Sequence, residues 1–313
     1  MKAWKKLLLC GLLAPSFLTG CSSQTEDKLN IVVSMYPEYE WVKAISEGVD
    51  NINLRCLIDN NIDLHSYQPS VDDVISIAKA NLFIYVGGES DAWVNNAIAA
   101  SKSKATNLSL LNVLGDRKKA EEEKEGMQEE SEEHEHEEAV EYDEHVWNSL
   151  QNAKIFVNSI KNTLIGIDAN NKEKYQANAV NYLAKIDALE NKYKGTLLNA
   201  SQRTLVVADR FPFRYLFDDY GLDYYAAFKG CSTDSEASFE TVIFLSRKVD
   251  ELGLDNIIVT TSSDGRIGES VKQNTTKKNQ TILKLNSLET ATNNRDYLSL
   301  FEDNLKVLVE ATK

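Results

Sequence analysis

The chain has few cysteines and histidines, the residues that cross-link small domains and bind metal clusters. Its 313 residues include only four cysteines, four histidines and four prolines. No two cysteines form a C-x-x-C pair, so a structural zinc knuckle is not supported. Basic residues do not gather in a stripe, which argues against nucleic acid as a partner. The H-E-x-x-H, G-x-S-x-G and P-loop motifs are absent as well, so a hydrolase has no sequence signature here.

The sequence also lacks an apolar run long enough to span a membrane. Three lysines, the last at Lys6, precede an apolar stretch over residues 7–18, whereas a spanning helix needs roughly 20 residues. This order is typical of an export signal, and the small residues before Cys21 resemble the lipobox of bacterial lipoproteins. The resemblance implies cleavage before Cys21 and a lipid anchor on its sulfur, at the outer face of the bacterial cytoplasmic membrane. An ordinary cleaved signal is the alternative.

Signal removal and lipidation leave two cysteines, Cys56 and Cys231. A disulfide is permitted outside the cytoplasm, but a bridge needs Cα atoms about 4.4–6.8 Å apart. The sequence does not show that distance, so a bridge and two separate thiols both stay open.

The acidic charge is concentrated in one segment. The net charge is −14, and residues 121–145 hold fourteen acidic residues, one lysine and three of the four histidines. The rest of the chain has 34 acidic and 33 basic residues and is therefore nearly neutral. The segment shows no apolar periodicity that could compensate for the entropy of ordering, so we predict that it is mobile.

Short, β-branched apolar runs alternate with helical patterns in both halves of the chain, as in parallel strands covered on both faces. The predicted strands are 29–35, 52–58, 82–86 and 105–110, followed by 204–208, 223–228, 256–260 and 282–285. Between the two sets, residues 172–198 place apolar side chains at steps of three and four, which indicates one helix of roughly 40 Å. The predicted fold is α/β, with two βα lobes whose four-stranded, mainly parallel sheets are joined by one long rigid helix.

This pattern divides the chain into seven segments. They are a signal peptide (1–20), a tether (21–28), an N-terminal lobe (29–115), an acidic His-rich flexible loop (116–141), the end of the N-terminal lobe (142–170), a connecting helix (171–200) and a C-terminal lobe (201–313).

Two histidines have local contexts that suit a metal site. His65 follows the second predicted strand, and His145 lies just before a helix entrance at Ser149. Asp209 follows the first strand of the second lobe, and ligands of open parallel sheets bind beyond the carboxyl ends of strands. Imidazole and carboxylate suit zinc, so we predict His65, His145 and Asp209 as ligands. His134 and His136 are predicted to collect metal more loosely.

Two motifs resemble the metal-ligand motifs of substrate-binding lipoproteins of zinc and manganese ABC importers. They are Asp-Leu-His-Ser-Tyr-Gln-Pro at residues 63–69 and Asp-Glu-His-Val-Trp at residues 143–147. The resemblance covers nearly the whole chain from Cys21 onward, and the acidic His-rich insertion is characteristic of the zinc branch. It implies two lobes joined by a long helix, with the metal held between them and passed to a membrane permease.

The sequence departs from this family in the second lobe. The position of the family's usual third ligand is Arg210, and that of the fourth is Asn286. A guanidinium only donates hydrogen bonds, so Arg210 cannot ligate zinc. Asp209 is the nearest replacement, and Glu236 and Asn286 are further candidates.

These features together predict a carrier and not an enzyme. We expect a lipid-anchored monomer that captures Zn²⁺ and delivers it to an ABC permease, with Mn²⁺ or iron as alternative metals. A metal-dependent surface adhesin or sensor is an alternative function, and a zinc hydrolase is a weaker one.

Overall fold

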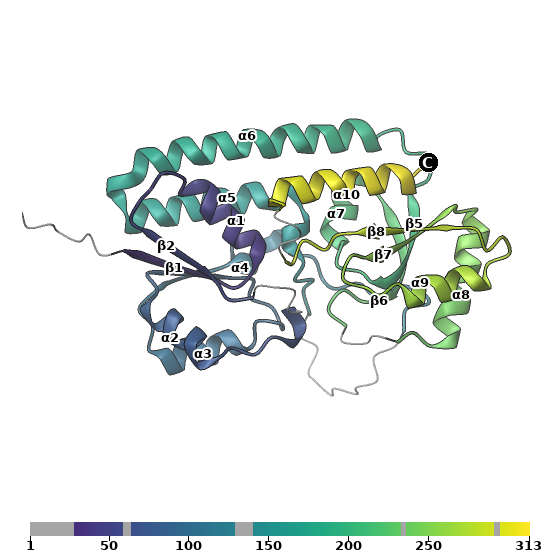
Figure 1. Ribbon diagram of the computed structural model, residues 1–313, viewed down its shortest axis with the longest axis horizontal. Helices are drawn as coiled ribbons and strands as arrows, with labels where there is room; N and C mark the ends of the chain where they lie inside the picture. The colour runs from purple at the N-terminus through teal and green to yellow at the C-terminus, as the bar shows by residue number, and fades with distance from the viewer. Residues whose placement is uncertain (1–27, 59–63, 129–139, 233–235, 291–294) are drawn as a thin grey trace, which may run out of the picture.

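The structure, a computed structural model, describes residues 28–58, 64–128, 140–232, 236–290 and 295–313. Two lobes lie next to each other, and the long helix α6 (Lys172–Leu197) runs along one side of both (Figure 1). Each lobe holds one four-stranded parallel sheet, which confirms the predicted fold class. Across the described ranges, no helix is long and apolar enough to cross a membrane.

The first sheet has the strand order β2-β1-β3-β4. All of its neighbouring strands are parallel, and β1 and β3 at its centre are almost wholly buried. Its strands are β1 (Leu29–Val33), β2 (Ile52–Cys56), β3 (Leu82–Tyr85) and β4 (Thr106–Ser109). Its helices are α1 (Tyr36–Ile45), α2 (Val71–Lys79), α3 (Trp93–Ser101), α4 (Leu110–Leu114) and α5 (Leu150–Ile167).

The second sheet repeats this order as β6-β5-β7-β8. In both sheets the first strand lies between the second and the third, so the chain reverses direction across the sheet at that strand. Ligands of such sheets bind beyond the strand ends near the reversal. The strands are β5 (Thr204–Arg210), β6 (Asp223–Phe228), β7 (Asn256–Thr260) and β8 (Thr281–Leu285). The helices are α7 (Arg214–Tyr220), α8 (Phe239–Leu252), α9 (Arg266–Asn274) and α10 (Tyr297–Ala311).

Helix α6 joins the lobes through the apolar stripe that the sequence predicted. Helix α6 lies along α1 and α5 in the first lobe and along α10 in the second (Figure 1). The stripe consists of Tyr175, Ala179, Tyr182, Ile186, Leu189, Tyr193 and Leu197, and all of these side chains are buried except Tyr182, which is half-buried. The hydroxyl of Tyr193 donates a 2.6 Å hydrogen bond to the carbonyl of Phe301 on α10. A helix held along its length in this way limits the movement of one lobe against the other.

The ends of the acidic loop predicted at 116–141 make defined contacts, although the sequence predicted a mobile segment throughout. Ala120 and Tyr142 form an antiparallel bridge. Glu122 accepts hydrogen bonds from Arg214 and from the hydroxyl of Tyr224. The amide of Gln128 donates to a carbonyl of β6 at 2.9 Å. In the described part of this segment, the carboxylate of Glu122 therefore has cationic and hydroxyl partners on the second lobe.

Candidate metal centre

His65 lies in a short helical turn, Leu64–Ser66, in the loop that follows β2. Leu64 is buried and anchors the turn in the core. The hydroxyl of Ser90, in the loop after β3, lies 2.7 Å from the Nδ1 atom of His65. The amide of Ser90 donates to the buried carboxylate of Glu144 at 3.0 Å. Two strand-end loops and the segment next to His145 thus meet at the His65 ring.

His145 is fully buried, and Asp143 fixes its orientation. The Oδ1 atom of Asp143 accepts the backbone N–H of His145 at 2.8 Å and lies 3.2 Å from the ring Nδ1 atom. The Nε2 atom of His145 is buried and has no hydrogen-bond partner among the described residues. A carboxylate behind one ring nitrogen, with the other nitrogen left to a metal, is the usual arrangement of a metal-binding histidine.

The turn after His145 attaches it to the second lobe. The indole nitrogen of Trp147 donates to the carbonyl of Ser287 at 2.8 Å. The amide of the Asn148 side chain donates to the carbonyls of Pro212 and Ser287 at 2.8 and 3.1 Å. Ser149 caps α5, as predicted, by accepting a hydrogen bond from a backbone amide of its first turn. His145 therefore sits where the two lobes meet.

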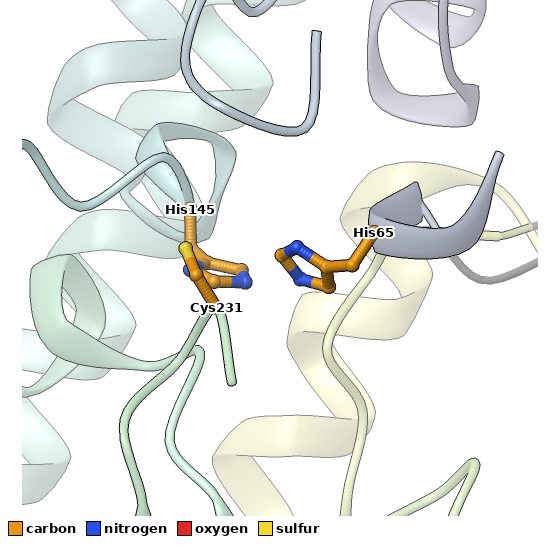
Figure 2. Close-up of side chains that lie close together, drawn as sticks. All are labelled: His65, His145 and Cys231. Carbon is orange, nitrogen blue, oxygen red and sulfur yellow. The ribbon is translucent and has the colours of Figure 1, made fainter. Parts of the chain in front are cut away.

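The rings of His65 and His145 face each other, and the side chain of Cys231 lies beside the His145 ring (Figure 2). The ring centroids are 5.5 Å apart and the ring planes are inclined by 51°. One potential ligand atom from each of the three residues lies within 4.8 Å of the other two. In the part of the chain that the structure describes, no other group of three or more His, Cys, Asp or Glu side chains is so arranged.

The structure does not bring Asp209 into this group. Strand β5 continues through Arg210, two residues beyond the predicted end, so Asp209 lies within the strand. Its Oδ2 atom accepts hydrogen bonds from the amide and hydroxyl of Thr260, at 3.0 and 2.8 Å. Its Oδ1 atom accepts the amide of Arg210 at 2.9 Å. The carboxylate therefore braces the carboxyl ends of β5 and β7 against each other.

The other predicted site residues have different surroundings. Asn286 is buried, and its Oδ1 atom accepts the amide of Leu288 at 2.7 Å. Its backbone pairs with the side chain of Asn304, which ties the loop after β8 to α10. Glu236 is exposed and is not in the three-residue group. His134, His136 and Cys21 lie outside the described residues.

Sequence reasoning considered Cys231 as a disulfide partner or a separate thiol, and not as a metal ligand. Neither Cys56 nor Cys231 forms a disulfide in the structure, so no bridge joins them. Cys231 lies three residues beyond β6, on the same loop edge of the second sheet as the end of β5. The rule that ligands bind beyond strand ends could have identified it.

The carboxylates around the group favour positive charge. Burial alone lowers the pKa of His145, but the hydrogen bond and charge of Asp143, with Glu289 and Glu144, raise it above the ordinary value. Burial raises the pKa of the Cys231 thiol well above its usual range, and the charges of Glu121, Glu144 and Asp143 add to this effect. A proton and a dication can both satisfy this environment, so they compete for it.

Imidazole nitrogen and thiolate sulfur are the donor types that zinc takes in proteins. The unpartnered Nε2 atom of His145 and the adjacent ring of His65 therefore fit a zinc ion. The comparisons with known proteins agree with this chemistry. The family model described as "Zinc-uptake complex component A periplasmic" matches residues 31–311.

Individual relatives show the same likeness. The zinc-binding lipoprotein AdcA of Streptococcus pneumoniae is 31% identical over 97% of this chain and 60% of its own length. This chain thus spans about 60% of the length of the curated relatives that it matches first. The Zn(II)-bound ZnuA-like domain of AdcA has a TM-score of 0.71 at 27% identity, over 91% of this chain and 99% of that domain. A laminin-binding adhesin of Streptococcus agalactiae reaches a TM-score of 0.76 over 91% of this chain and 100% of its own, but its 24% identity shows the fold alone. The chain belongs to the family of zinc-uptake complex component A.

Proposed function

We propose that this protein captures zinc outside the cytoplasmic membrane and delivers it to the permease of an ABC importer. The observation that carries this proposal is the meeting of His65 and His145 at the boundary of the lobes, with a buried, unpartnered Nε2 atom on His145. Zinc is the cargo here and not a resident cofactor. A carrier of zinc needs ligands that are preorganised for capture and that still allow release.

The surroundings of both rings support preorganised binding. Asp143 holds the Nδ1 side of the His145 ring, and Ser90 holds the Nδ1 side of the His65 ring. We assign the Nε2 atom of each ring to the metal. Because both rings are fixed by partners on their far side, little side-chain freedom is lost when zinc binds.

The relatives support zinc in preference to manganese. The printed name of the streptococcal relative describes a zinc-binding lipoprotein, and its related domain was crystallised with Zn(II). The matching family is a component of an uptake complex, which supports transport and not hydrolysis. The adhesin alternative rests on likeness of fold alone. We further propose a lipid anchor at Cys21, a monomeric carrier, and loose metal collection by His134 and His136.

The test is metal analysis and calorimetric titration of protein purified without chelators. We expect one tightly bound zinc per chain in the unaltered protein, and loss of tight binding in His65→Ala and in His145→Ala. The control is the double variant His134→Ala with His136→Ala, which removes two imidazoles from the acidic loop and should keep the tight site. Unchanged tight binding in both single variants would refute the assignment.

Delivery needs a separate test in cells. Removing the protein should slow growth under zinc chelation, and added zinc should restore growth. A surface adhesin or sensor would leave zinc-limited growth unchanged, so this result separates the two functions.

A further inference from the structure

We infer that Cys231 supplies the ligand from the second lobe, so that zinc is bound by two imidazoles and one thiolate. This inference rests on the proposed function, since it completes the site of His65 and His145. Sulfur is a usual zinc ligand, with a Zn–S distance of about 2.3 Å.

The distances suit a single ion. Bond lengths of about 2.0–2.3 Å at tetrahedral angles place zinc ligands roughly 3.3–3.6 Å from one another. The candidate ligand atoms of His65, His145 and Cys231 lie within 4.8 Å of one another. An inward movement of about 1 Å therefore brings all three onto the ion, which is within reach of side-chain rotation and a small shift of one loop.

Gly230 allows the loop after β6 to lie against the His145 ring. A Cβ atom at this position would be 2.9 Å from the Cε1 atom of His145 and 2.9 Å from the carbonyl oxygen of Phe211. Both distances are too short for a carbon side chain, so any other residue here would push the loop away from the ring. The next residue is Cys231, whose side chain lies beside the His145 ring (Figure 2) and whose sulfur is within 4.8 Å of a ring nitrogen of His145 and of His65.

Two further contacts hold the loop in this position. The Oε1 atom of Glu121 accepts the amide of Cys231 at 3.2 Å. The Nη1 atom of Arg210 donates to the carbonyl of Ser232 at 3.3 Å. Arg210 stands where the resembling family usually has a metal ligand. In this chain that position cannot ligate, but it holds the residue next to Cys231, so the second-lobe ligand has moved from the end of β5 to the loop after β6.

The thiolate also decides which metals the site prefers. Binding replaces the thiol proton with the ion, so the S–H bond breaks, a Zn–S bond forms and the proton leaves to solvent. Two neutral imidazoles and one thiolate leave one net positive charge on bound Zn²⁺, which faces the carboxylates of Asp143 and Glu144. A soft sulfur ligand favours zinc over manganese, which prefers oxygen. We therefore expect Mn²⁺ to compete poorly with Zn²⁺.

Cobalt(II) reports the sulfur ligand directly. In the full chain loaded with Co²⁺, a thiolate ligand gives a near-ultraviolet sulfur-to-cobalt charge-transfer band. We expect the band in the unaltered chain and in Cys56→Ser, and its loss in Cys231→Ser. Cys56 is the matched control because it is also half-buried and forms no disulfide, and the other cysteines are common to both variants. Zinc affinity should fall on the order of 100-fold or more in Cys231→Ser and stay unchanged in Cys56→Ser. A residue that only hydrogen-bonds to a metal ligand typically changes the affinity by about 10- to 100-fold.

The outcomes separate this inference from the proposed function. If the band is absent and Cys231→Ser binds zinc like Cys56→Ser, Cys231 is not a ligand, while loss of binding in His65→Ala would still support the carrier. If His65→Ala binds zinc normally, the carrier site itself is wrong. If Cys231→Ser does not fold, alkylation of the unaltered chain decides the question: zinc should protect Cys231 and leave the reactivity of Cys56 unchanged, and equal reactivity of Cys231 with and without zinc would overturn the inference.

Discussion

Asp143→Asn is the most informative change at this site. It keeps the size of the side chain and an oxygen that can accept the amide of His145, but it removes the charge behind the Nδ1 atom. The contacts at stake are the 2.8 Å bond to the amide and the 3.2 Å contact to the ring. Asp143 is only 3% exposed, so solvent does not screen its charge effectively.

The expected loss follows from the role of this carboxylate. Removing an outer partner of a metal-bound histidine lowers metal affinity 10- to 100-fold, which corresponds to about 1.4–2.7 kcal/mol. Because Asp143 is buried, we expect a value near about 100-fold at pH 8. The ring remains able to bind zinc through Nε2, so binding should weaken and not vanish.

The pH dependence of the loss gives a sharper test. Asp143 is the main group that raises the pKa of His145. A proton competes with zinc for the ring, so the affinity of the unaltered protein falls as pH drops through that raised pKa. Asp143→Asn lowers the pKa, so proton competition sets in at lower pH and the difference between the two proteins shrinks in acid. The folding stability of the metal-free protein depends on pH in the opposite direction to its zinc affinity. Protonated His145 stabilises the fold fully below the unfolded-state pKa, and this stabilisation disappears as pH rises through the folded-state pKa.

The assay is competition with a chromogenic zinc chelator between pH 5.5 and pH 8. Asp168→Asn is the matched control. Asp168 lies at the far end of α5 and accepts a 2.7 Å hydrogen bond from Tyr175, so this substitution also removes a charge from a hydrogen-bonded carboxylate. The control should bind zinc like the unaltered chain at every pH. An equal loss in both variants, or a loss in Asp143→Asn that does not vary with pH, would refute the role given to Asp143.

Three further predictions test other parts of the account. Deleting residues 129–139, which removes His134 and His136, should leave one tight zinc site by calorimetry but slow zinc capture in stopped-flow mixing, since local cation concentration affects the rate of association. Gly230→Ala should lower zinc affinity at least about 10-fold and lower the melting temperature, because the added Cβ atom would be 2.9 Å from His145 and from a backbone oxygen; Gly166→Ala, whose Cβ atom would meet nothing within 4 Å, is the control. Burial, with a smaller contribution from Asp91, raises the pKa of Glu38 to about 8, so the free energy of unfolding should fall as pH rises from about 4.5 to about 8. Glu38→Gln should flatten that fall in urea titrations at pH 5 and pH 8, and an unchanged slope would contradict the assignment.

The fold was predictable from the sequence because its signals are local. Short runs with apolar residues, many of them β-branched, marked the strands, and the spacing of apolar residues marked α6 from Lys172 to its end near Leu197. Strand and helix ends were less certain, because hydrogen bonds between strands decide where each one stops. Strand β5 shows this: it continues through Arg210, since its neighbour β6 pairs with it that far.

The proximity of the two histidines in the candidate site was predictable for a similar reason. His65 and His145 each stand in a local motif, and the structure places their rings 5.5 Å apart. The second-lobe half has no such motif. Whether the carboxylate of Asp209 points to a metal or to Thr260 depends on the alignment of β5 with β7, which no local pattern in the sequence reveals.

Arg210 shows why residue-by-residue transfer of a motif fails here. Taken alone, a cation at a ligand position suggests that the second lobe has lost its half of the site. In three dimensions its guanidinium holds the carbonyl of Ser232, and Glu121 holds the amide of Cys231 from the other side. If Cys231 is a ligand as inferred, the arginine at the end of β5 and the cysteine on the neighbouring loop are parts of a single arrangement, which depends on contacts between segments far apart in the sequence.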